Sequence, residues 1–142
     1  MTIPVVNLAD FTSGDPILKK NFVEKLGRAF EEVGFVAVGN HGISANLMET
    51  LYKNVQQFFS LPYEKKKNFE SHELAGQRGY TSFGKEHAKG SDAPDLKEFF
   101  QYGQVVPTTH NLKSEYPDNV KVDEVSGFDE TFFTAYRAFE KS

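Results

Sequence analysis

The sequence predicts an α+β fold, in which amphipathic helices pack on a few short strands. Three segments carry apolar side chains at spacings of three and four residues, the pattern of a helix with one buried face. Shorter apolar runs with β-branched or aromatic residues are typical of strands. The most informative segment is Gly34–Ser44, where the apolar run 35–38 leads into an Asn-His-Gly turn. We expect this run to be a core strand covered on both faces.

In the first half of the chain, we expect a strand over residues 3–8, with Pro4 near its start, and a connection over residues 10–15. Asp15 and Pro16 then provide an N-cap and a proline in the first helical turn, where its absent N–H costs nothing. The apolar stripe of this helix ends at a glycine suited to a left-handed cap, and it consists of Leu18, Phe22, Leu26, Ala29, Phe30 and Val33.

In the second half, a helix that Ser44 can cap is expected to end near Ser60, because Pro62 cannot continue the hydrogen-bond ladder. A shorter helix over residues 63–69 follows. Two segments rich in glycine, proline and polar residues predict loops over 71–95 and 104–125, with a strand over 96–102 between them. The last helix is indicated by a stripe that consists of Phe128, Phe132, Ala135, Tyr136 and Phe139.

Length and composition indicate one domain over residues 1–142. The net charge of -4 argues against broad nucleic-acid binding, and we expect the basic run Lys65–Lys67 to be a solvated helix face. The absence of cysteine excludes disulfides and thiolate metal sites. No apolar run approaches the ~20 residues of a membrane-spanning helix. These features indicate a cytoplasmic protein.

The histidines are the first candidates for metal ligands: His41, His72, His87 and His110. An iron site of two histidines and one carboxylate usually contains His-x-Asp or His-x-Glu and a distant histidine. The second residue after each histidine is not a carboxylate, being Ile43, Leu74, Lys89 or Leu112. His41 stands in a turn instead, where we expect its ring to bind backbone carbonyls. We therefore predict that these residues alone form no metal site.

Residues 79–85 match the Gly-x-x-x-x-Gly-Lys spacing of a phosphate-binding loop. The next residue is Glu86, however, where a serine or threonine would hold magnesium, and no amphipathic helix follows. We therefore reject nucleotide binding, which ATP-dependent thermal stabilisation would reveal. The sequence also lacks a Gly-x-Ser-x-Gly motif, and pairs such as Glu31-Glu32 fall on a helix face. We predict no catalytic residue in this chain.

Five stretches follow one another in a particular order: 3–8, Gly34–Ser44, Phe58–Pro62 with Glu64-Lys65, Arg78–Tyr80, and Asp95–Phe100 before Gly103. Each is short, but together they cover nearly the whole chain. In order and spacing they resemble the N-terminal domain of the isopenicillin N synthase-like family. The members of this family are non-haem iron(II)- and 2-oxoglutarate-dependent oxygenases.

The resemblance implies that this chain is the N-terminal part of a double-stranded β-helix (jelly-roll) oxygenase whose C-terminal core is absent here. That core would hold iron(II) and 2-oxoglutarate and oxidise a small organic substrate. The chain lacks the family's His-x-Asp, distant histidine and Arg-x-Ser elements. We therefore expect neither the metal nor the co-substrate to bind this chain. The last helix has no glycine cap before Ser142, which suggests a cut within a longer protein.

The same resemblance points to Arg78 and Tyr80 as substrate-binding residues, because the matching loop of the family runs near the mouth of the active site. A guanidinium there could hold a carboxylate through two hydrogen bonds, and Tyr80 could close over it. The alternative is that Tyr80 packs the loop while Arg78 is a surface cation. We interpret Lys97 and Glu98 as strand residues that form a local ion pair.

Without the second half, apolar helix faces and strand edges would lose part of their cover, so we expect the isolated chain to form a homo-oligomer. A second hypothesis, from another class, is a stand-alone binding or dimerisation module derived from this fold. A capped last helix would favour that module. The sequence does not specify the substrate.

Overall fold

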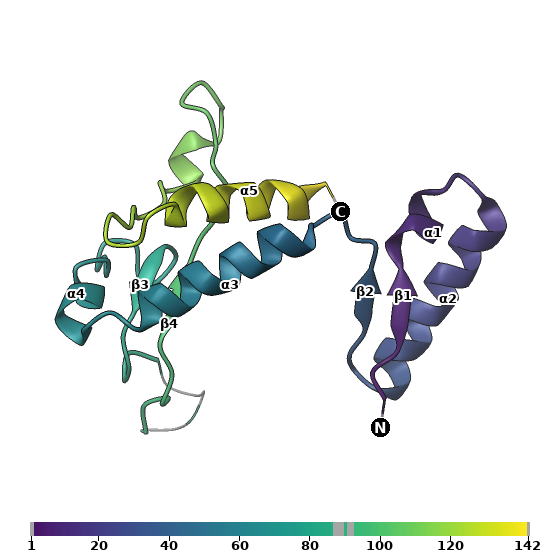
Figure 1. Cartoon of the computed structure of the whole chain (residues 1–142), viewed down its shortest axis with the longest axis horizontal. Coiled ribbons are helices and arrows are strands. Elements are labelled where there is room, and N and C mark those ends of the chain that lie inside the picture. Colours follow the sequence, from purple (N-terminus) through teal and green to yellow (C-terminus); the bar gives the residue numbers. More distant parts are fainter. Residues whose placement is uncertain (1, 87–89, 91–92, 142) are drawn as a thin grey trace. The chain divides into compact units, whose positions relative to one another are not determined.

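The structure is a computed structural model that describes residues 2–86, 90 and 93–141. Within the single domain predicted for the chain, it shows two compact units. One comprises the described residues of Met1–Ser44 and Arg137–Ser142, and the other comprises Ala45–Tyr136. Both units contain helices and strands (Figure 1), so a mixed helix and strand fold is confirmed.

The first unit is a strand–helix–strand arrangement. Strand β1 (Val5–Asn7) pairs in parallel with β2 (Ala37–Gly39), and α2 (Pro16–Glu32) lies in the connection between them. Parallel strands need a crossover of this kind, because the end of the first strand and the start of the second lie at opposite ends of the strand pair. The predicted cap is confirmed, since the Asp15 carboxylate accepts hydrogen bonds from the N–H groups of Ile17 and Leu18.

A short helix, α1 (Leu8–Thr12), includes the first three residues of the segment 10–15, for which we predicted a connection. That prediction is wrong for a local reason. The Asn7 side chain caps the helix by accepting a hydrogen bond from the Ala9 N–H at 3.1 Å, and its amide donates to Asp10 at 2.8 Å. Asparagine is among the best N-cap residues, so the signal was present in the sequence.

The segment 35–38 is not the doubly covered core strand that the sequence predicted. Phe35 is 69% exposed and Val38 is 39% exposed. The reason is that β2 has one strand neighbour, β1, and the buried residues of this unit come from Val6, Phe22 and Ala29 instead. Apolar composition alone therefore overstated the burial of this run within the chain.

The second unit contains the helices that follow Ser44 in the chain. Helix α3 (Ala45–Phe59) ends where Pro62 predicts, and α4 (Tyr63–Lys67) is the predicted short helix. Helix α5 (Phe128–Glu140) confirms the last apolar stripe. Buried Asn54 joins α3 to the start of α5 by donating to the Gly127 carbonyl and the Thr131 hydroxyl, at 3.2 and 3.0 Å.

Two short strands complete this unit. Strand β4 (Phe99–Gln101) confirms the predicted strand over a narrower range, and a 3₁₀ turn, η1 (Lys113–Glu115), follows it. Strand β3 (Gly79–Thr81) pairs with β4 in an antiparallel ladder, within a segment for which we predicted only loop. Gly79 lets β3 pass close to the backbone of Phe69, because a Cβ there would lie 2.5 Å from the Phe69 carbonyl oxygen.

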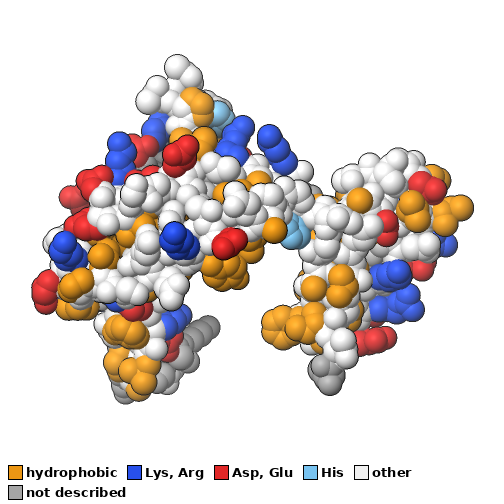
Figure 2. Space-filling view, in the orientation of Figure 1, with side chains coloured by type: hydrophobic (Ala, Val, Ile, Leu, Met, Phe, Trp, Pro, Cys, Tyr) orange, Lys and Arg blue, Asp and Glu red, His pale blue; other side chains and the backbone are white. Residues whose placement is uncertain are grey.

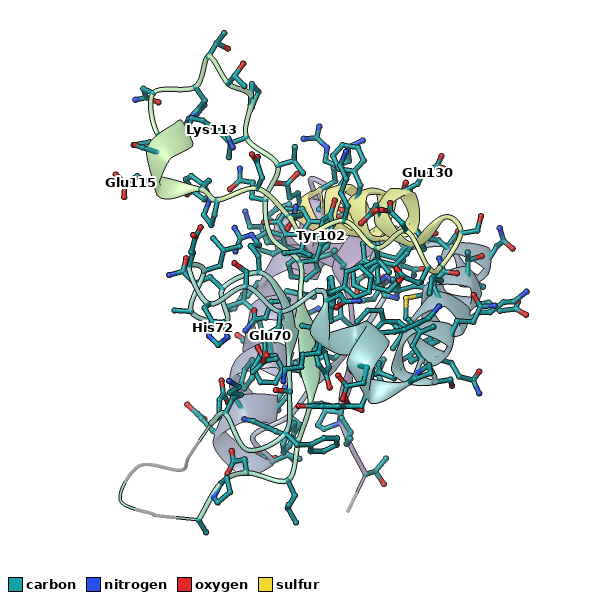
Figure 3. All side chains as sticks on the ribbon, turned by 90° about the vertical axis from the view of Figure 1, so that its left-hand side faces the viewer. Glu70, His72, Tyr102, Lys113, Glu115 and Glu130 are labelled. Carbon is teal, nitrogen blue, oxygen red and sulfur yellow. The ribbon has the colours of Figure 1, made fainter. Side chains whose placement is uncertain are left out.

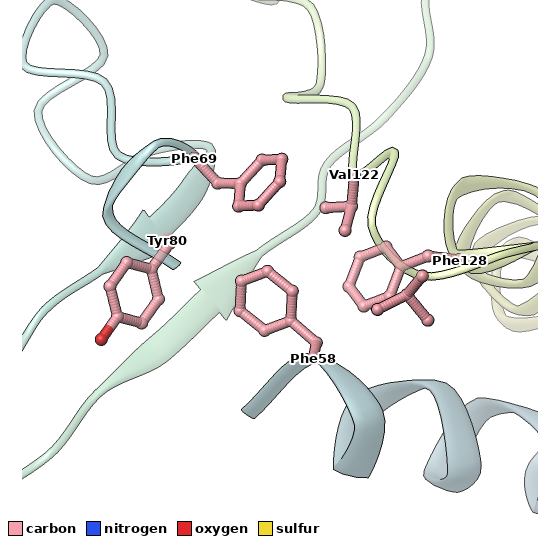
Figure 4. Packing of buried hydrophobic residues seen from close by; sticks show 6 residues of the cluster. Phe58, Phe69, Tyr80, Val122 and Phe128 are labelled. Carbon is pink, nitrogen blue, oxygen red and sulfur yellow. The ribbon is translucent and has the colours of Figure 1, made fainter. Parts of the chain in front are cut away.

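The core of the second unit is an aromatic cluster centred on Phe58, which is fully buried (Figure 4). Its ring lies 5.0 Å from that of Phe100 and 5.4 Å from that of Phe128, measured between centroids. The remaining buried members come from the loops and from β3, and they are Phe69, Tyr80, Val122 and Val125. Six of the 14 phenylalanines therefore belong to this cluster or pack against it.

Large apolar side chains also lie at the surface of each unit, where Figure 2 shows them among charged groups. In the first unit they include Val5, Ile17 and Phe35, each more than half exposed. In the second, Leu96 is 93% exposed. Within the described part of the chain, no helix is long and apolar enough to cross a membrane.

Candidate functional site

The Arg78 guanidinium, predicted to contact substrate, lies across Gly103 at the point where β3 begins and β4 has ended. A Cβ on Gly103 would be only 2.1 Å from Arg78 Cζ, so a side chain there would displace the guanidinium. The close approach therefore depends on glycine at this position. It brings together two residues that are far apart in the sequence.

Asn119 holds the Gly103 backbone in place through a pair of hydrogen bonds. Its side-chain oxygen accepts from the Gly103 N–H at 2.7 Å, and its amide donates to the Gly103 carbonyl at 2.9 Å. Sequence reasoning missed Asn119, since a single asparagine in a long loop gives no signal of a distant partner. Asn119 therefore fixes the Gly103 backbone against which the Arg78 guanidinium lies.

Arg78 itself is only partly satisfied. Its Nη1 donates to the Gln77 carbonyl at 2.7 Å, but its buried Nε has no hydrogen-bond partner. Among the described residues, no carboxylate forms an ion pair with it. A half-buried guanidinium with unused donors suits a planar anion such as a carboxylate, which can accept two of its N–H groups.

Tyr80, the second predicted substrate residue, lies in the aromatic core and is 1% exposed. Its hydroxyl donates a hydrogen bond to the Glu98 carboxylate. Burial, together with the hydrogen bond and negative charge of Glu98, raises the pKa of Tyr80 well above its usual range. A contact between Tyr80 and substrate stays a prediction, whereas its packing role is visible.

Glu98 is also the partner of Lys66, whose Nζ lies 2.7 and 2.8 Å from the two carboxylate oxygens. Lys66 is buried, so the prediction of a solvated face is wrong at this position of the basic run. The predicted local pair of Lys97 with Glu98 is wrong too, because Lys97 pairs with Glu86 and Asp95 at 2.7 and 3.3 Å. Lys97 and Glu98 both precede β4, so the alternation of side chains along a strand does not determine their directions.

Two of the described histidines, His41 and His110, lie in turns. His41 stands in the predicted turn, where Asn40 and Gly42 have positive φ angles of 53° and 77°. Its Nδ1 accepts a hydrogen bond from the Ile43 N–H, which is a backbone donor. The expected hydrogen bonds from the ring to backbone carbonyls stay a prediction. His110 accepts from the Leu112 N–H in a similar turn. His87 lies outside the described residues.

The described residues do not fit an iron site, because no group of three or more His, Cys, Asp or Glu among them could hold a metal ion. The phosphate-loop match at residues 79–85 also has no supporting structure. Its start forms β3, and no helix follows it among the described residues before η1. Of the residues that the sequence singled out, Arg78 remains a cation with a donor that no described residue uses.

Comparisons with known proteins give a family and several relatives. Residues 3–124 match the model of a family described as non-haem dioxygenase in morphine synthesis N-terminal. The 2-oxoglutarate-dependent dioxygenase thnC of Trichoderma harzianum is 30% identical over 108 residues, which are 75% of this chain and 34% of thnC. The homoarginine-6-hydroxylase 2-ODD-233 of Oryza sativa subsp. japonica is 34% identical over 111 residues, covering 70% of this chain and 33% of that protein.

Two solved structures match almost the entire chain. A 2OG-Fe(II) oxygenase family protein from Caulobacter crescentus aligns with 99% of this chain at a TM-score of 0.77 and 29% identity. A full-length protein of Neurospora crassa, solved in complex with alpha-KG, aligns with 98% at a TM-score of 0.74 and 26% identity. This chain covers 44% and 43% of those chains, and about a third of the curated relatives.

Proposed function

We propose a function from one premise: this chain belongs to the non-haem dioxygenase N-terminal family. It serves an oxygenase that oxidises a small organic substrate with iron(II) and 2-oxoglutarate. The curated relatives that it matches are named as a 2-oxoglutarate-dependent dioxygenase and a homoarginine-6-hydroxylase, and they are a little more than twice as long as this chain. In this proposal the present chain supports the fold and one wall of the substrate pocket. The iron and the co-substrate would be held by residues outside it.

The observation that carries the substrate role is the half-buried Arg78 guanidinium on Gly103. Its Nε is buried without a partner, and it forms no ion pair with the described carboxylates. Leaving a buried donor unsatisfied costs about 1–3 kcal/mol, so such a group favours a ligand that accepts from it. We therefore assign Arg78 to a carboxylate of the substrate.

The test uses the product of the complete coding frame that contains this chain, supplied with iron(II) and 2-oxoglutarate and a panel of small organic acids. Succinate release that depends on iron and is stimulated by one of the acids is the expected result. Absence of iron-dependent succinate release, with and without every acid of the panel, would contradict the oxygenase function. Extending the frame also shows directly whether His-x-Asp, a distant histidine and Arg-x-Ser are encoded.

For an acid that stimulates turnover, Arg78→Gln is expected to raise its KM about 10- to 100-fold, because a charge-assisted hydrogen bond contributes about 1.5–3 kcal/mol. The KM for 2-oxoglutarate should stay unchanged. Arg28→Gln is the matched control, since Arg28 is an exposed arginine on α2. An equal effect of both variants, or an equal rise in the two KM values, would exclude the assigned role.

The alternative function is a binding or dimerisation module, favoured by the exposed apolar residues of β1 and β2 and by their open strand edges. We expect this chain, expressed by itself, to sediment as a homo-oligomer at micromolar concentration. Val5→Lys, which places a charge on the exposed face of β1, should shift the distribution toward monomer. A single monomeric species at all concentrations would count against self-association.

A further inference from the structure

A second polar cavity, separate from Arg78, lies beside β3 and is lined by Tyr80 and Thr81 of that strand. Its volume is about 180 Å³. Tyr80 and Thr81 are adjacent in β3, so their side chains point to opposite faces, and Tyr80 occupies the core face. The other residues that line the cavity are Glu70, Ser71, His72, Ala75, Gly76, Lys85 and Glu86.

The floor of this cavity contains an unsatisfied hydroxyl. Thr81 is 7% exposed, and its Oγ1 is buried without a hydrogen-bond partner. Gly76 faces it, and a Cβ there would lie 3.4 Å from Thr81 Oγ1. The glycine therefore leaves space in front of a buried hydroxyl that still has its full capacity to accept and donate.

Glu70 supplies an anion to the lining of the same cavity. Its Oε1 accepts hydrogen bonds from the Ser82 N–H at 3.2 Å and the Ser82 hydroxyl at 2.9 Å, whereas no described residue donates to Oε2. Burial by itself raises the pKa of Glu70, but the bonds from Ser82 and the charges of Lys85 and His72 outweigh it, so the pKa is lowered. The carboxylate is therefore ionised and has an oxygen to spare.

The rim of the cavity has the opposite charge. His72 and Lys85 are both exposed (Figure 3 labels Glu70 and His72 as neighbours). Glu86 also lies at the rim, but its carboxylate is paired with Lys97 at 2.7 Å. Among the described residues, the charges left without an ion pair are the Glu70 carboxylate inside the cavity and the Lys85 ammonium at its opening.

We propose that this cavity binds the zwitterionic head of a small free amino acid. The ammonium would donate to Glu70 Oε2 and Thr81 Oγ1, and the carboxylate would face Lys85 and His72. The size agrees, since a cavity of about 150 Å³ accommodates a molecule of about six non-hydrogen atoms, and alanine is of that size. This inference does not depend on the oxygenase function, because it concerns binding to this chain alone.

The test is a titration of the ¹⁵N-labelled chain with L-alanine, followed by amide chemical shifts. Saturable shifts at Gly76 and Ser82 are the expected result. Ethylamine and propionate, which carry the ammonium or the carboxylate alone, should each bind at least about 10-fold more weakly, because each loses a charge-assisted contact. Absence of saturable shifts with L-alanine overturns the proposal, and so does equal binding of ethylamine, which would exclude a contact between the carboxylate and Lys85.

Two variants locate the ligand in this cavity. Glu70→Gln is expected to weaken L-alanine binding at least about 10-fold, and Thr81→Val, which keeps the shape and removes the hydroxyl, about 3- to 10-fold. Thr81→Val should not unfold the chain, because the hydroxyl that it removes has no partner. Glu64→Gln, an exposed position on α4, is the control. Unchanged affinity in Thr81→Val would overturn the assignment.

Discussion

Replacing Glu98 with glutamine is expected to lower the free energy of unfolding by about 3–5 kcal/mol, because it leaves the buried Lys66 ammonium without its counter-charge. The side chains of Lys66 and Glu98 are 8% and 16% exposed, and Nζ contacts both carboxylate oxygens. A glutamine still accepts the hydrogen bond from the Tyr80 hydroxyl, so the main loss is the ionic one. Urea unfolding of the chain, followed by circular dichroism, measures the effect.

Lys97→Gln is the matched control for this experiment, since Lys97 is the neighbouring residue and its pair with Glu86 is exposed. Ion pairs at the surface contribute little, so the urea midpoint should not move. The double variant Lys66→Met, Glu98→Gln removes both charges and should recover most of the stability lost in Glu98→Gln. A Glu98→Gln variant as stable as Lys97→Gln would show that the buried pair does not hold this unit together.

The pair of Lys66 and Glu98 also shows what could not be predicted from the sequence. The amphipathic stripes located α2, α3 and α5 correctly, because a repeating apolar pattern over many residues is a strong signal. Lys66, in contrast, looks like its neighbours in a basic run, and its burial depends on Glu98, 32 residues further along the chain. Pairings of this kind are set by tertiary packing, and a single sequence carries no trace of them.

The candidate sites, too, could be predicted only in part. Arg78 could be singled out from the family resemblance, but its support by Gly103 and Asn119 could not, because it depends on a close approach between loops. The cavity beside Thr81 was not predicted, because the phosphate-loop spacing over residues 79–85, which contains Thr81 and Lys85, gives no indication of Glu70 or Gly76. Its residues lie within one loop-rich segment, and the unsatisfied hydroxyl became visible only when the turn at Gly76 was placed against β3.

Phe58→Ala is expected to destabilise the chain by about 3–5 kcal/mol, as truncation of a fully buried phenylalanine removes apolar contacts and leaves a cavity. Phe58 is 0% exposed and touches rings from every part of its unit. The centroid distances run from 5.0 to 5.9 Å, and the neighbouring rings belong to Phe59, Phe69, Tyr80, Phe100 and Phe128. The same urea titration provides the measurement.

Tyr52→Ala separates the loss of the core from the loss of an aromatic residue on a helix. Tyr52 lies on α3 as well, but it is 69% exposed, so its truncation should change stability by less than about 0.5 kcal/mol. Phe58→Leu should fall between the two, since it restores part of the volume. If Phe58→Ala and Tyr52→Ala were equally stable, the cluster could not be what joins α3, β3, β4 and α5 into one unit.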